Sequence, residues 1–335
     1  MTTTKRVALV GCGTVSSNHL HALLSVEGIC VCALCDVRIE RAEQARDTFF
    51  PQARVYTDFD TMLREEELYA VHICTPHYLH APMTKAALAR DIHVFLEKPM
   101  AITAEDMDAL IEAEKNSRGR VCVCFQNRFS PAFLRAKELC DADGGIQTAA
   151  ATVIWQRTRE YYTESGWRGR MATEGGGVMV NQAIHTIDLL CQCLGKPTEV
   201  IATCANHHLK DVNDVEDTCE GIIRFDSGKQ ASFFATTASV AQKDITSILL
   251  FTAHHTVEIR MPYLYIDAET VEKTEDDRWF VGKACYGSGH ACLIPRFYEA
   301  LEGGDPMPVS LVSARAAHDI FLAAHRSNDT PVSIS

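Results

Sequence analysis

The sequence lacks the features that would place a chain in a membrane, on nucleic acid or among disordered proteins. No apolar run approaches the roughly 18 residues that a membrane-spanning helix needs, and no cluster of Lys and Arg stands out. Acidic residues outnumber basic ones by 44 to 32, so the net charge of −12 repels nucleic acid and anionic membrane surfaces. There is no Ser/Gly linker, low-complexity segment or internal repeat. With 47% hydrophobic and 23% charged residues, the composition is that of an ordinary globular protein.

The 14 cysteines do not follow the spacing of a disulfide scaffold or a zinc ribbon. Many lie in strand-like runs, such as Cys30 and Cys32, or Cys122 and Cys124. Alternate positions of a strand share one face, so two such thiols are a candidate metal pair. The other interpretation is that cysteine acts here as a small buried hydrophobic residue in a reducing compartment. We favour this second interpretation and predict no metal site.

The first third of the chain alternates short apolar runs with helical patterns, and 335 residues are enough for about two domains. Such alternation predicts right-handed βαβ crossovers and a doubly wound parallel sheet. The first run, 7–10, is too short for a signal peptide, so we expect a cytoplasmic protein. Ligands bind at the carboxyl ends of parallel strands, which makes the residues after each strand the candidates for a site. The predicted strands are 7–10, 29–36, 54–56, 70–74, 92–96 and 121–125.

The rest of the chain has the longer alternating segments of a mainly antiparallel sheet. Asp226-Ser227-Gly228-Lys229 is typical of a hairpin turn between two of them. We place a domain boundary near residue 126, which gives a first domain of 1–126 and a second of 127–335. The expected strands are 148–157, 199–205, 218–225, 230–237, 246–252, 256–260 and 264–267, with helices at 131–140, 178–194, 289–301 and 313–325.

A glycine-rich loop follows the first predicted strand and opens a helix. It reads Gly11-Cys12-Gly13-Thr14-Val15-Ser16, a GxGxx pattern with Ser at the third glycine position. The first glycine permits a tight turn, and the second lets backbone N–H groups approach a pyrophosphate at the helix N-terminus. The alternative is a glycine turn in an α/β domain that binds no dinucleotide.

Two side chains after the second strand bear on the choice of dinucleotide. Asp36 ends that strand and can accept hydrogen bonds from the hydroxyls of the adenosine ribose. Its charge also repels a 2′-phosphate, which favours NAD over NADP. Arg38 is the complication, because a nearby Arg accommodates that phosphate.

Five motifs in order along the chain give it a resemblance to a known family. They are VGCG at 10–13, ICTPHYLHAPM at 73–83, LEKPM at 96–100, GGGVMVNQAIHTIDLL at 175–190 and YGSGHACLIPRFYEAL at 286–301. This ordered set resembles the Gfo/Idh/MocA family (glucose–fructose oxidoreductase and inositol dehydrogenase-like proteins), and it covers nearly the whole chain. The resemblance implies an N-terminal Rossmann domain and a C-terminal α+β domain with a large open, mainly antiparallel sheet. It also implies NAD(P)-dependent oxidation of sugars, cyclitols and sugar nucleotides, and a homodimer or homotetramer.

Lys98 lies directly after a predicted strand, within Glu97-Lys98-Pro99. Pro99 restricts Lys98 to extended backbone conformations. At the ligand-binding edge of the sheet, a Lys can hydrogen-bond a substrate hydroxyl and take part in proton transfer. The resemblance supports this role, and the alternative is an exposed Lys in a tight turn.

Asn181 and His185 are four residues apart in a predicted helix and therefore share one face. In the family, the position of Asn181 usually holds Asp, and the His at position 185 accepts a proton from the substrate alcohol. Asn181 carries no charge, so an Asp–His pair is in doubt and Lys98 and His185 remain the acid/base candidates. A buried histidine with no catalytic role is the other interpretation of His185. For Asp188 we favour a structural role.

The resemblance also implies contacts for several further residues. For the cofactor they are Gly11, Gly13, Thr14, Val15, Asp36, Arg38, Thr75, Pro76, His80, Glu97, Lys98, Gln126, Trp167 and Arg168. For the substrate they are Lys98, Arg128, Tyr161, Asn181, His185 and His290. A capping Thr75, a surface His80 and a packing Tyr161 are equally compatible with the sequence.

We therefore predict an NAD-dependent dehydrogenase or reductase that acts on a small sugar-like molecule, with Lys98 and His185 handling the hydroxyl proton. One alternative keeps NAD but cleaves a glycoside by transient oxidation and elimination, with no net redox change; Asn181 keeps it open. Another is a non-enzymatic NAD-binding regulator, which Lys98 and His185 argue against.

Overall fold

The computed structural model describes residues 4–240, 244–274 and 287–334, which fall into two compact units. The first unit contains the chain up to Gln126 together with Gly289–Ser313, and the second contains Asn127–Ser288 and the chain from Ala314 onward. No helix within these described residues is long and apolar enough to cross a membrane.

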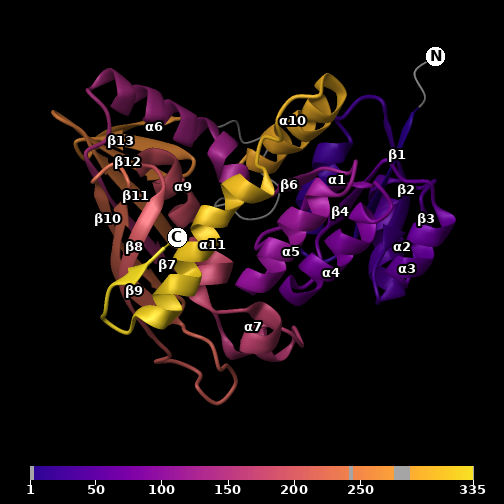
Figure 1. Cartoon of the computed structure of the whole chain (residues 1–335), viewed down its shortest axis with the longest axis horizontal. Helices are drawn as coiled ribbons and strands as arrows, with labels where there is room; N and C mark the ends of the chain where they lie inside the picture. Colours follow the sequence, from indigo (N-terminus) through magenta and orange to yellow (C-terminus); the bar gives the residue numbers. More distant parts are fainter. Residues whose placement is uncertain (1–3, 241–243, 275–286, 335) are drawn as a thin grey trace. The chain divides into compact units, whose positions relative to one another are not determined.

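The first unit is built on a parallel sheet of six strands in the order β3-β2-β1-β4-β5-β6 (Figure 1). This order confirms the predicted doubly wound sheet, and the strand order reverses between β1 and β4, where such folds bind ligands. The strands are β1 Lys5–Val10, β2 Ile29–Cys35, β3 Arg54–Tyr56, β4 Ala70–Ile73, β5 His93–Leu96 and β6 Val121–Val123. The helices are α1 Ser16–Leu23, α2 Ile39–Phe49, α3 Phe59–Glu65, α4 His77–Leu88, α5 Ala104–Lys115 and α10 Gly289–Gly303, and the 3₁₀ turn η1 Gln126–Phe129 begins at the unit's edge.

Local sequence explains where these elements lie. The strand β4 is buried along its whole length and β1 from Val7 to Val10, as expected for a sheet that is covered on both faces. Asp58 and Thr103 cap the helices that follow them, because their side chains accept the N–H groups of Thr61 and Asp106.

The helix α10 belongs to the first unit, whereas the sequence pattern assigns everything after residue 126 to the second domain. It packs on α1, and beyond it the carbonyl of Val309 accepts the N–H of Val123 at 2.9 Å. The first unit is thus completed by a segment that returns from far along the chain. The functional roles assigned to the two domains stay predictions.

The second unit contains a nine-stranded sheet in the order β14-β13-β12-β11-β7-β10-β9-β8-β15. All neighbouring strands whose register is described pair antiparallel except β7 and β10, which are parallel, so the sheet is mixed but mainly antiparallel. The strands are β7 Thr148–Ile154, β8 Pro197–Ala205, β9 Thr218–Phe225, β10 Gln230–Thr236, β11 Ile245–Phe251, β12 Thr256–Arg260, β13 Tyr263–Ile266, β14 Glu269–Lys273 and β15 Val332–Ser333.

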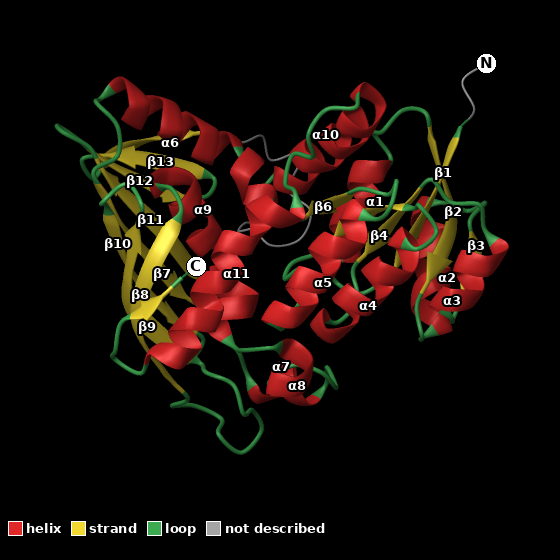
Figure 2. Cartoon of the chain, in the orientation of Figure 1, coloured by secondary structure: helices red, strands yellow, loops and turns green. Residues whose placement is uncertain are grey.

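Helices cover one face of this sheet, and Figure 2 shows α6 and α9 alongside its strands. Alternate side chains of β7 are buried, in agreement with the period-two pattern of the sequence. A π-helical turn, η2, leads directly into α9, a feature that the apolar periodicity does not reveal. The helical elements are α6 Pro131–Ala142, α7 Arg159–Thr163, α8 Met171–Glu174, η2 Met179–Ala183, α9 Ile184–Leu194 and α11 Leu311–Ser327.

Candidate active site

The loops after β1 and β4 lie against each other at the carboxyl edge of the parallel sheet. Gly11 has φ +88°, and a Cβ there would lie 2.6 Å from the carbonyl carbon of Cys74. Only glycine fits this turn without forcing the two loops apart. A Cβ on Gly13, by contrast, would meet no atom within 4 Å, so the loop is open at its second glycine. These features fit a loop that lets a dinucleotide pyrophosphate approach the start of α1.

Asp36 follows β2 and is fixed by this loop. Its carboxylate oxygens accept the backbone N–H groups of Cys12 and Arg38, each at 2.8 Å. The side chain is buried, so its charge is held beside the glycine loop. A carboxylate oxygen can accept more than one hydrogen bond, which leaves capacity for ribose hydroxyls.

The loop after β4 contains Thr75 and Pro76, and Pro76 lies at the N-cap of α4. The Thr75 hydroxyl faces the sulfur of Met83 at 3.6 Å. His80 is buried, with one ring nitrogen 2.6 Å from the carbonyl oxygen of Pro99 and the other 2.8 Å from that of Thr75. Only a doubly protonated ring donates to both carbonyls, whereas burial lowers the pKa of His80 and favours the neutral ring. We infer that the buried His80 ring is neutral and donates to one of the two carbonyls at a time. In either case His80 links the loop after β4 to the loop after β5.

Lys98 follows β5 and is partly exposed, while its neighbour Glu97 is buried. Glu97 accepts a hydrogen bond from Nε2 of His19 at 2.9 Å and one from Nε2 of His290 at 3.3 Å. Its other oxygen faces the backbone N–H of Lys98 at 3.2 Å. The carboxylate beside Lys98 is therefore held from three directions.

A chain of hydrogen bonds continues from Glu97 into the interior of the first unit. The Nδ1 atoms of His19 and His72 are 3.0 Å apart, and Nε2 of His72 is 2.8 Å from the hydroxyl of Tyr298. If His19 donates to Glu97, its Nδ1 must accept from His72, and His72 must then accept from Tyr298. Every donor in this arrangement points toward Glu97. The sequence patterns predict no role for His19, His72 or Tyr298.

His19, Glu97, Cys124 and His290 are all buried, and their potential ligand atoms lie within 4.8 Å of one another. The distance of 2.9 Å between His19 and Glu97 is that of a hydrogen bond. Two ligands on one tetrahedral zinc would be farther apart, at about 3.3 Å for metal bonds near 2.0 Å. We therefore interpret the cluster as a hydrogen-bonded network. In it, His290 contacts Glu97, and Gln126 accepts the weak hydrogen bond of the Cys124 thiol at 3.7 Å.

In the second unit, Asn181 lies on the π-helical turn η2 and is partly exposed. Its amide nitrogen donates to the hydroxyl of Tyr161 at 3.0 Å and to the carboxylate of Glu174. Burial raises the pKa of Glu174 to about 7. No motif in the sequence predicts a role for Glu174, although its place directly before three glycines is a visible signal.

His185 is the second residue of α9 and is partly exposed. One turn farther, Asp188 is buried and receives a hydrogen bond from Nε of Arg128 at 2.7 Å. Asp188 therefore pairs with Arg128, which supports the structural role that we expected for it. Substrate contact by Arg128 stays a prediction.

Aromatic and basic side chains gather around Tyr161. The guanidinium of Arg168 lies 4.4 Å from the centre of the Tyr161 ring and 4.9 Å from that of Trp167. Arg157 lies 4.8 Å from the same tyrosine ring. These contacts bring Trp167, Arg168 and Tyr161 together, although the sequence assigned the first two to the cofactor and the third to the substrate. Both assignments stay predictions.

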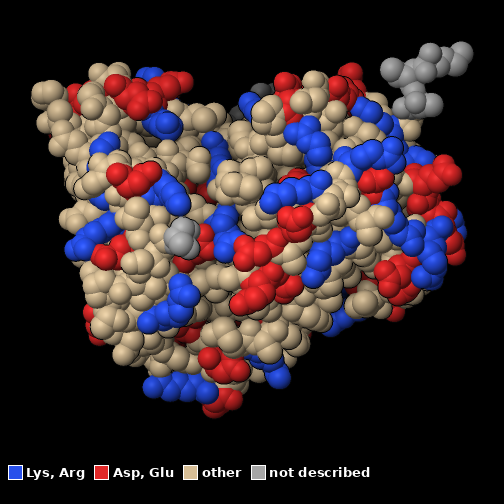
Figure 3. Space-filling model, viewed as in Figure 1, with Lys and Arg blue, Asp and Glu red and all other residues tan. Residues whose placement is uncertain are grey.

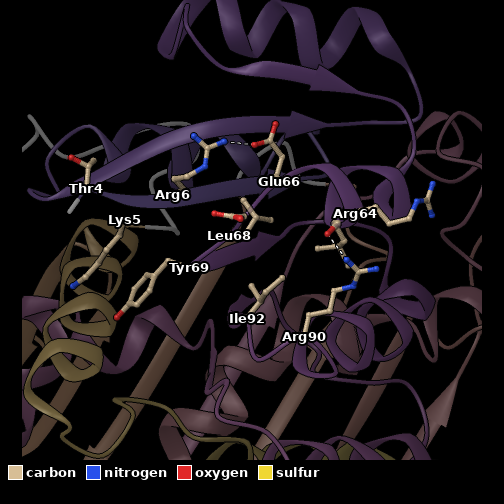
Figure 4. A pocket seen from close by; sticks show the side chains of 11 residues that line it. Thr4, Lys5, Arg6, Arg64, Glu66, Leu68, Tyr69, Arg90 and Ile92 are labelled. Carbon is tan, nitrogen blue, oxygen red and sulfur yellow. Dashed lines mark hydrogen bonds and ion pairs between the residues drawn. The ribbon is translucent and has the colours of Figure 1, made fainter.

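A hollow of about 570 Å³ in the first unit is not the candidate site (Figure 4). It lies at the amino ends of the strands, where Lys5 and Arg6 begin β1 and Ile92 precedes β5. Figure 4 shows Arg6 paired with Glu66 across it, so its charges are partly compensated. Dinucleotides bind at the opposite edge of such a sheet. The loops at the carboxyl ends of the strands are therefore the better candidate for the cofactor site.

Most described cysteines are buried, in line with their expected role as small hydrophobic residues. Two cysteines have a further role that the sequence did not predict: Cys204 and Cys219 face each other across β8 and β9 and form a disulfide.

On the face drawn in Figure 3, acidic and basic side chains are interspersed.

Two family models match the chain. Residues 5–125 match the "Oxidoreductase family, NAD-binding Rossmann fold", and residues 133–259 match the "GFO/IDH/MocA C-terminal domain". The chain belongs to the Gfo/Idh/MocA family. The first unit is thus an NAD-binding Rossmann domain, and the resemblance read from the motifs is confirmed.

The curated relatives of this chain include two kinds of sugar or cyclitol dehydrogenase. Inositol 2-dehydrogenase of Salmonella paratyphi B is 34% identical over 141 residues, which is 42% of this chain and 42% of that protein. D-apiose dehydrogenase of Paraburkholderia graminis is 29% identical over 231 residues, or 68% of this chain and 60% of that protein. The matches thus span roughly half of each relative's length.

Solved structures match the whole chain. The WlbA dehydrogenase from Bordetella pertussis, in complex with NADH and UDP-GlcNAcA, is 25% identical, with a TM-score of 0.86 over 99% of this chain and 98% of that one. A levoglucosan dehydrogenase in complex with NADH and levoglucosan is 20% identical, with a TM-score of 0.88 and coverage of 99% of both chains. At that identity the second likeness shows the fold alone.

Proposed function

We propose that the protein is an NAD-dependent dehydrogenase or reductase of a sugar, a cyclitol or a sugar derivative, with Lys98 and His185 handling the hydroxyl proton. The observation that carries the proposal is the edge of the parallel sheet, where the open glycine loop, buried Asp36 and partly exposed Lys98 all follow strands. The relatives named inositol 2-dehydrogenase and D-apiose dehydrogenase support the substrate class.

The residues after β1 and β2 would hold the cofactor. Gly11, Gly13, Thr14 and Val15 would border the pyrophosphate, and Asp36 would accept the ribose hydroxyls. When bound, NAD supplies a hydride acceptor at its nicotinamide C4. Because Asp36 is buried and ionised carboxylates repel a 2′-phosphate, we propose that NAD is preferred over NADP despite Arg38.

Lys98 and His185 would act on the substrate oxygen. The ammonium of Lys98 stabilises negative charge on that oxygen, and the imidazole of His185 accepts the proton as the carbinol becomes a carbonyl. Both side chains are partly exposed, so each is open to a small molecule. In the opposite direction the same groups return the proton.

The test is an absorbance assay at 340 nm with NAD and a panel containing myo-inositol, D-apiose, levoglucosan and UDP-GlcNAcA, repeated with NADP. We expect turnover with at least one polyol or sugar, and faster turnover with NAD than with NADP. Lys98→Ala and His185→Ala should each lower kcat by roughly 10²- to 10⁴-fold, the usual contribution of a general acid or base. The exposed Lys115 and His208 provide matched controls, because Lys115→Ala and His208→Ala should leave kcat unchanged.

Two other results would redirect the proposal. Full activity in a Lys98→Ala/His185→Ala double variant would show that other residues handle the proton. Glycoside turnover with tightly retained NAD and no net change at 340 nm would instead favour the redox-neutral elimination. The expected homodimer or homotetramer is tested separately by light scattering, and a cytoplasmic location by cell fractionation.

A further inference from the structure

Glu174 is a buried carboxylate that the proposed chemistry does not yet use. It is the last residue of α8 and directly precedes the glycines at 175–177. Its exposed fraction is only 1%. Burying a carboxylate costs free energy unless its oxygens are hydrogen-bonded, so its partners indicate why it is there.

Both oxygens of Glu174 serve as hydrogen-bond acceptors. Oε2 accepts the backbone N–H of Gly169 at 2.5 Å, and Oε1 accepts from the amide nitrogen of Asn181. An ionised carboxylate has only acceptors and satisfies both donors. A protonated carboxyl or a glutamine has a donor at one end, and one of the two hydrogen bonds must then be lost.

The bond from Asn181 fixes the orientation of its side chain. The amide nitrogen has two hydrogens, and these are directed to Glu174 and to the hydroxyl of Tyr161. The carbonyl oxygen of the same amide therefore faces away from both partners. Asn181 precedes His185 by four residues of a continuous helical segment, so the two side chains lie on neighbouring positions of one face.

The charges around Glu174 oppose one another. Arg168 attracts its carboxylate, whereas Glu216 repels it, and Glu216 is itself paired with His325 at 2.9 Å. Tyr161 is covered by Arg157 and Arg168. Burial outweighs these contributions and raises the pKa of Glu174 to about 7, so its charge changes within the working range of an enzyme.

We propose that Glu174 is a positioning residue of the active site, whose ionised carboxylate holds the amide of Asn181 in the orientation that the His185 face of the helix requires. This inference rests on the proposed function. Protonation of Glu174 removes one acceptor, releases the amide and lowers the rate of the step that His185 assists.

The first experiment compares wild type with Glu174→Gln across pH 5.5–9. Wild-type kcat should fall as pH drops through about 7, where Glu174 takes up its proton. Glu174→Gln mimics that protonated state, so its kcat at pH 8.5 should be roughly 10- to 100-fold below wild type, as expected for a misplaced group. Glu174→Gln should lose the part of the fall near pH 7 that Glu174 causes, so that its pH profile differs from that of wild type, and KM for NAD should not change. Glu164→Gln, the same change at an exposed site, is the control and should keep the wild-type profile.

A second variant separates positioning from a folding defect. In Glu174→Gln/Asn181→Asp the donor and acceptor exchange places, because the introduced amide can accept from Gly169 and donate to the introduced carboxylate. We expect this double variant to recover at least 10-fold in kcat over Glu174→Gln alone. If Glu174→Gln keeps wild-type kcat and pH profile, or if the exchange rescues nothing in a folded protein, the inference is wrong while the proposed function stands. If the wild-type protein turns over none of the sugars and polyols in the 340 nm assay, the proposed function is wrong, and the inference about Glu174, which rests on it, is wrong as well.

Discussion

Glu97 in the first unit and Glu174 in the second are both buried carboxylates, with exposed fractions of 5% and 1%, yet their pKa values move in opposite directions. Burial acts to raise the pKa of Glu97, but hydrogen bonds from His19 and His290 outweigh it and hold that pKa well below the usual value. For Glu174, burial prevails and the pKa rises to about 7.

The difference lies in the donors. Glu97 receives two imidazole N–H groups and a backbone N–H, and the chain through His72 to Tyr298 orients one of those imidazoles. Glu174 receives one backbone and one amide N–H, and Glu216 repels its charge. The protonation state of a buried acid therefore depends on the donors aimed at it more than on the depth of burial. The first carboxylate is a permanent charge and the second is a switchable one.

The largest effect is expected from removing a donor of Glu97. His19→Ala leaves a buried charge without its main partner, which should lower the free energy of unfolding by about 3–5 kcal/mol. Urea denaturation at pH 7 measures this loss. His21→Ala on the exposed side of the same helix is the control, with an expected loss near 0.5 kcal/mol. A loss below about 1 kcal/mol for His19→Ala would mean that the network does not stabilise Glu97.

The next effect is a contrast in pH dependence. The pKa of Glu97 is lowered in the folded protein, so ionised Glu97 contributes to the free energy of unfolding at pH values above its unfolded pKa. This contribution is lost as pH falls through the folded pKa. The pKa of Glu174 is raised in the folded protein, so protonated Glu174 contributes to the free energy of unfolding at pH values below the unfolded pKa of 4.5. This contribution is lost as pH rises to about 7. At about 1.4 kcal/mol per pKa unit, the Glu174 change is on the order of 3 kcal/mol.

Urea unfolding at pH 3, 4.5 and 8 tests this contrast with two variants. Relative to wild type, Glu174→Gln should become more stable between pH 4.5 and pH 8, and Glu97→Gln should become less stable between pH 3 and pH 4.5. Parallel pH dependences in the two variants would contradict the assignment of one permanent and one switchable charge.

The smallest effect is expected at the far end of the Glu97 chain. Tyr298→Phe removes the hydroxyl that donates to His72, which should cost about 1 kcal/mol. The exposed Tyr78 supplies the control, since Tyr78→Phe should change stability by less than 0.5 kcal/mol. Equal effects of the two substitutions would show that the chain ends at His72.

The sequence predicts the periodic parts of the fold well. All six strands of the parallel sheet and most strands of the second sheet follow from apolar runs and alternation, and the strand-end rule points to the Gly11 loop, Asp36 and Lys98. The two-residue strand β15 is too short for a period to show, and β14, with the sequence ETVEK, has a single apolar residue and therefore no apolar alternation.

The buried networks could not be predicted because they join distant residues. His19 and Glu97 are 78 positions apart, and His290 and Glu97 are 193 apart. A polar residue in an apolar helical pattern, such as His19, signals that a partner exists but not which one. Glu174 could not be predicted for the same reason, because its role depends on its hydrogen bond with Asn181. The sequence shows that Asn181 departs from the family pattern, but it does not show that Glu174 is the partner of Asn181.

The return of α10 to the first unit has a consequence for how the protein is made. When a ribosome has produced residues up to Gln126, the Rossmann domain still lacks His290 for Glu97 and Val309 for the N–H of Val123. More than 150 further residues, including those of the intervening unit, must therefore be synthesised before the core and the sheet edge of the Rossmann domain are complete. An isolated 1–126 fragment is a poor substitute for the cofactor domain, and a faithful one must carry 289–313 spliced onto its end.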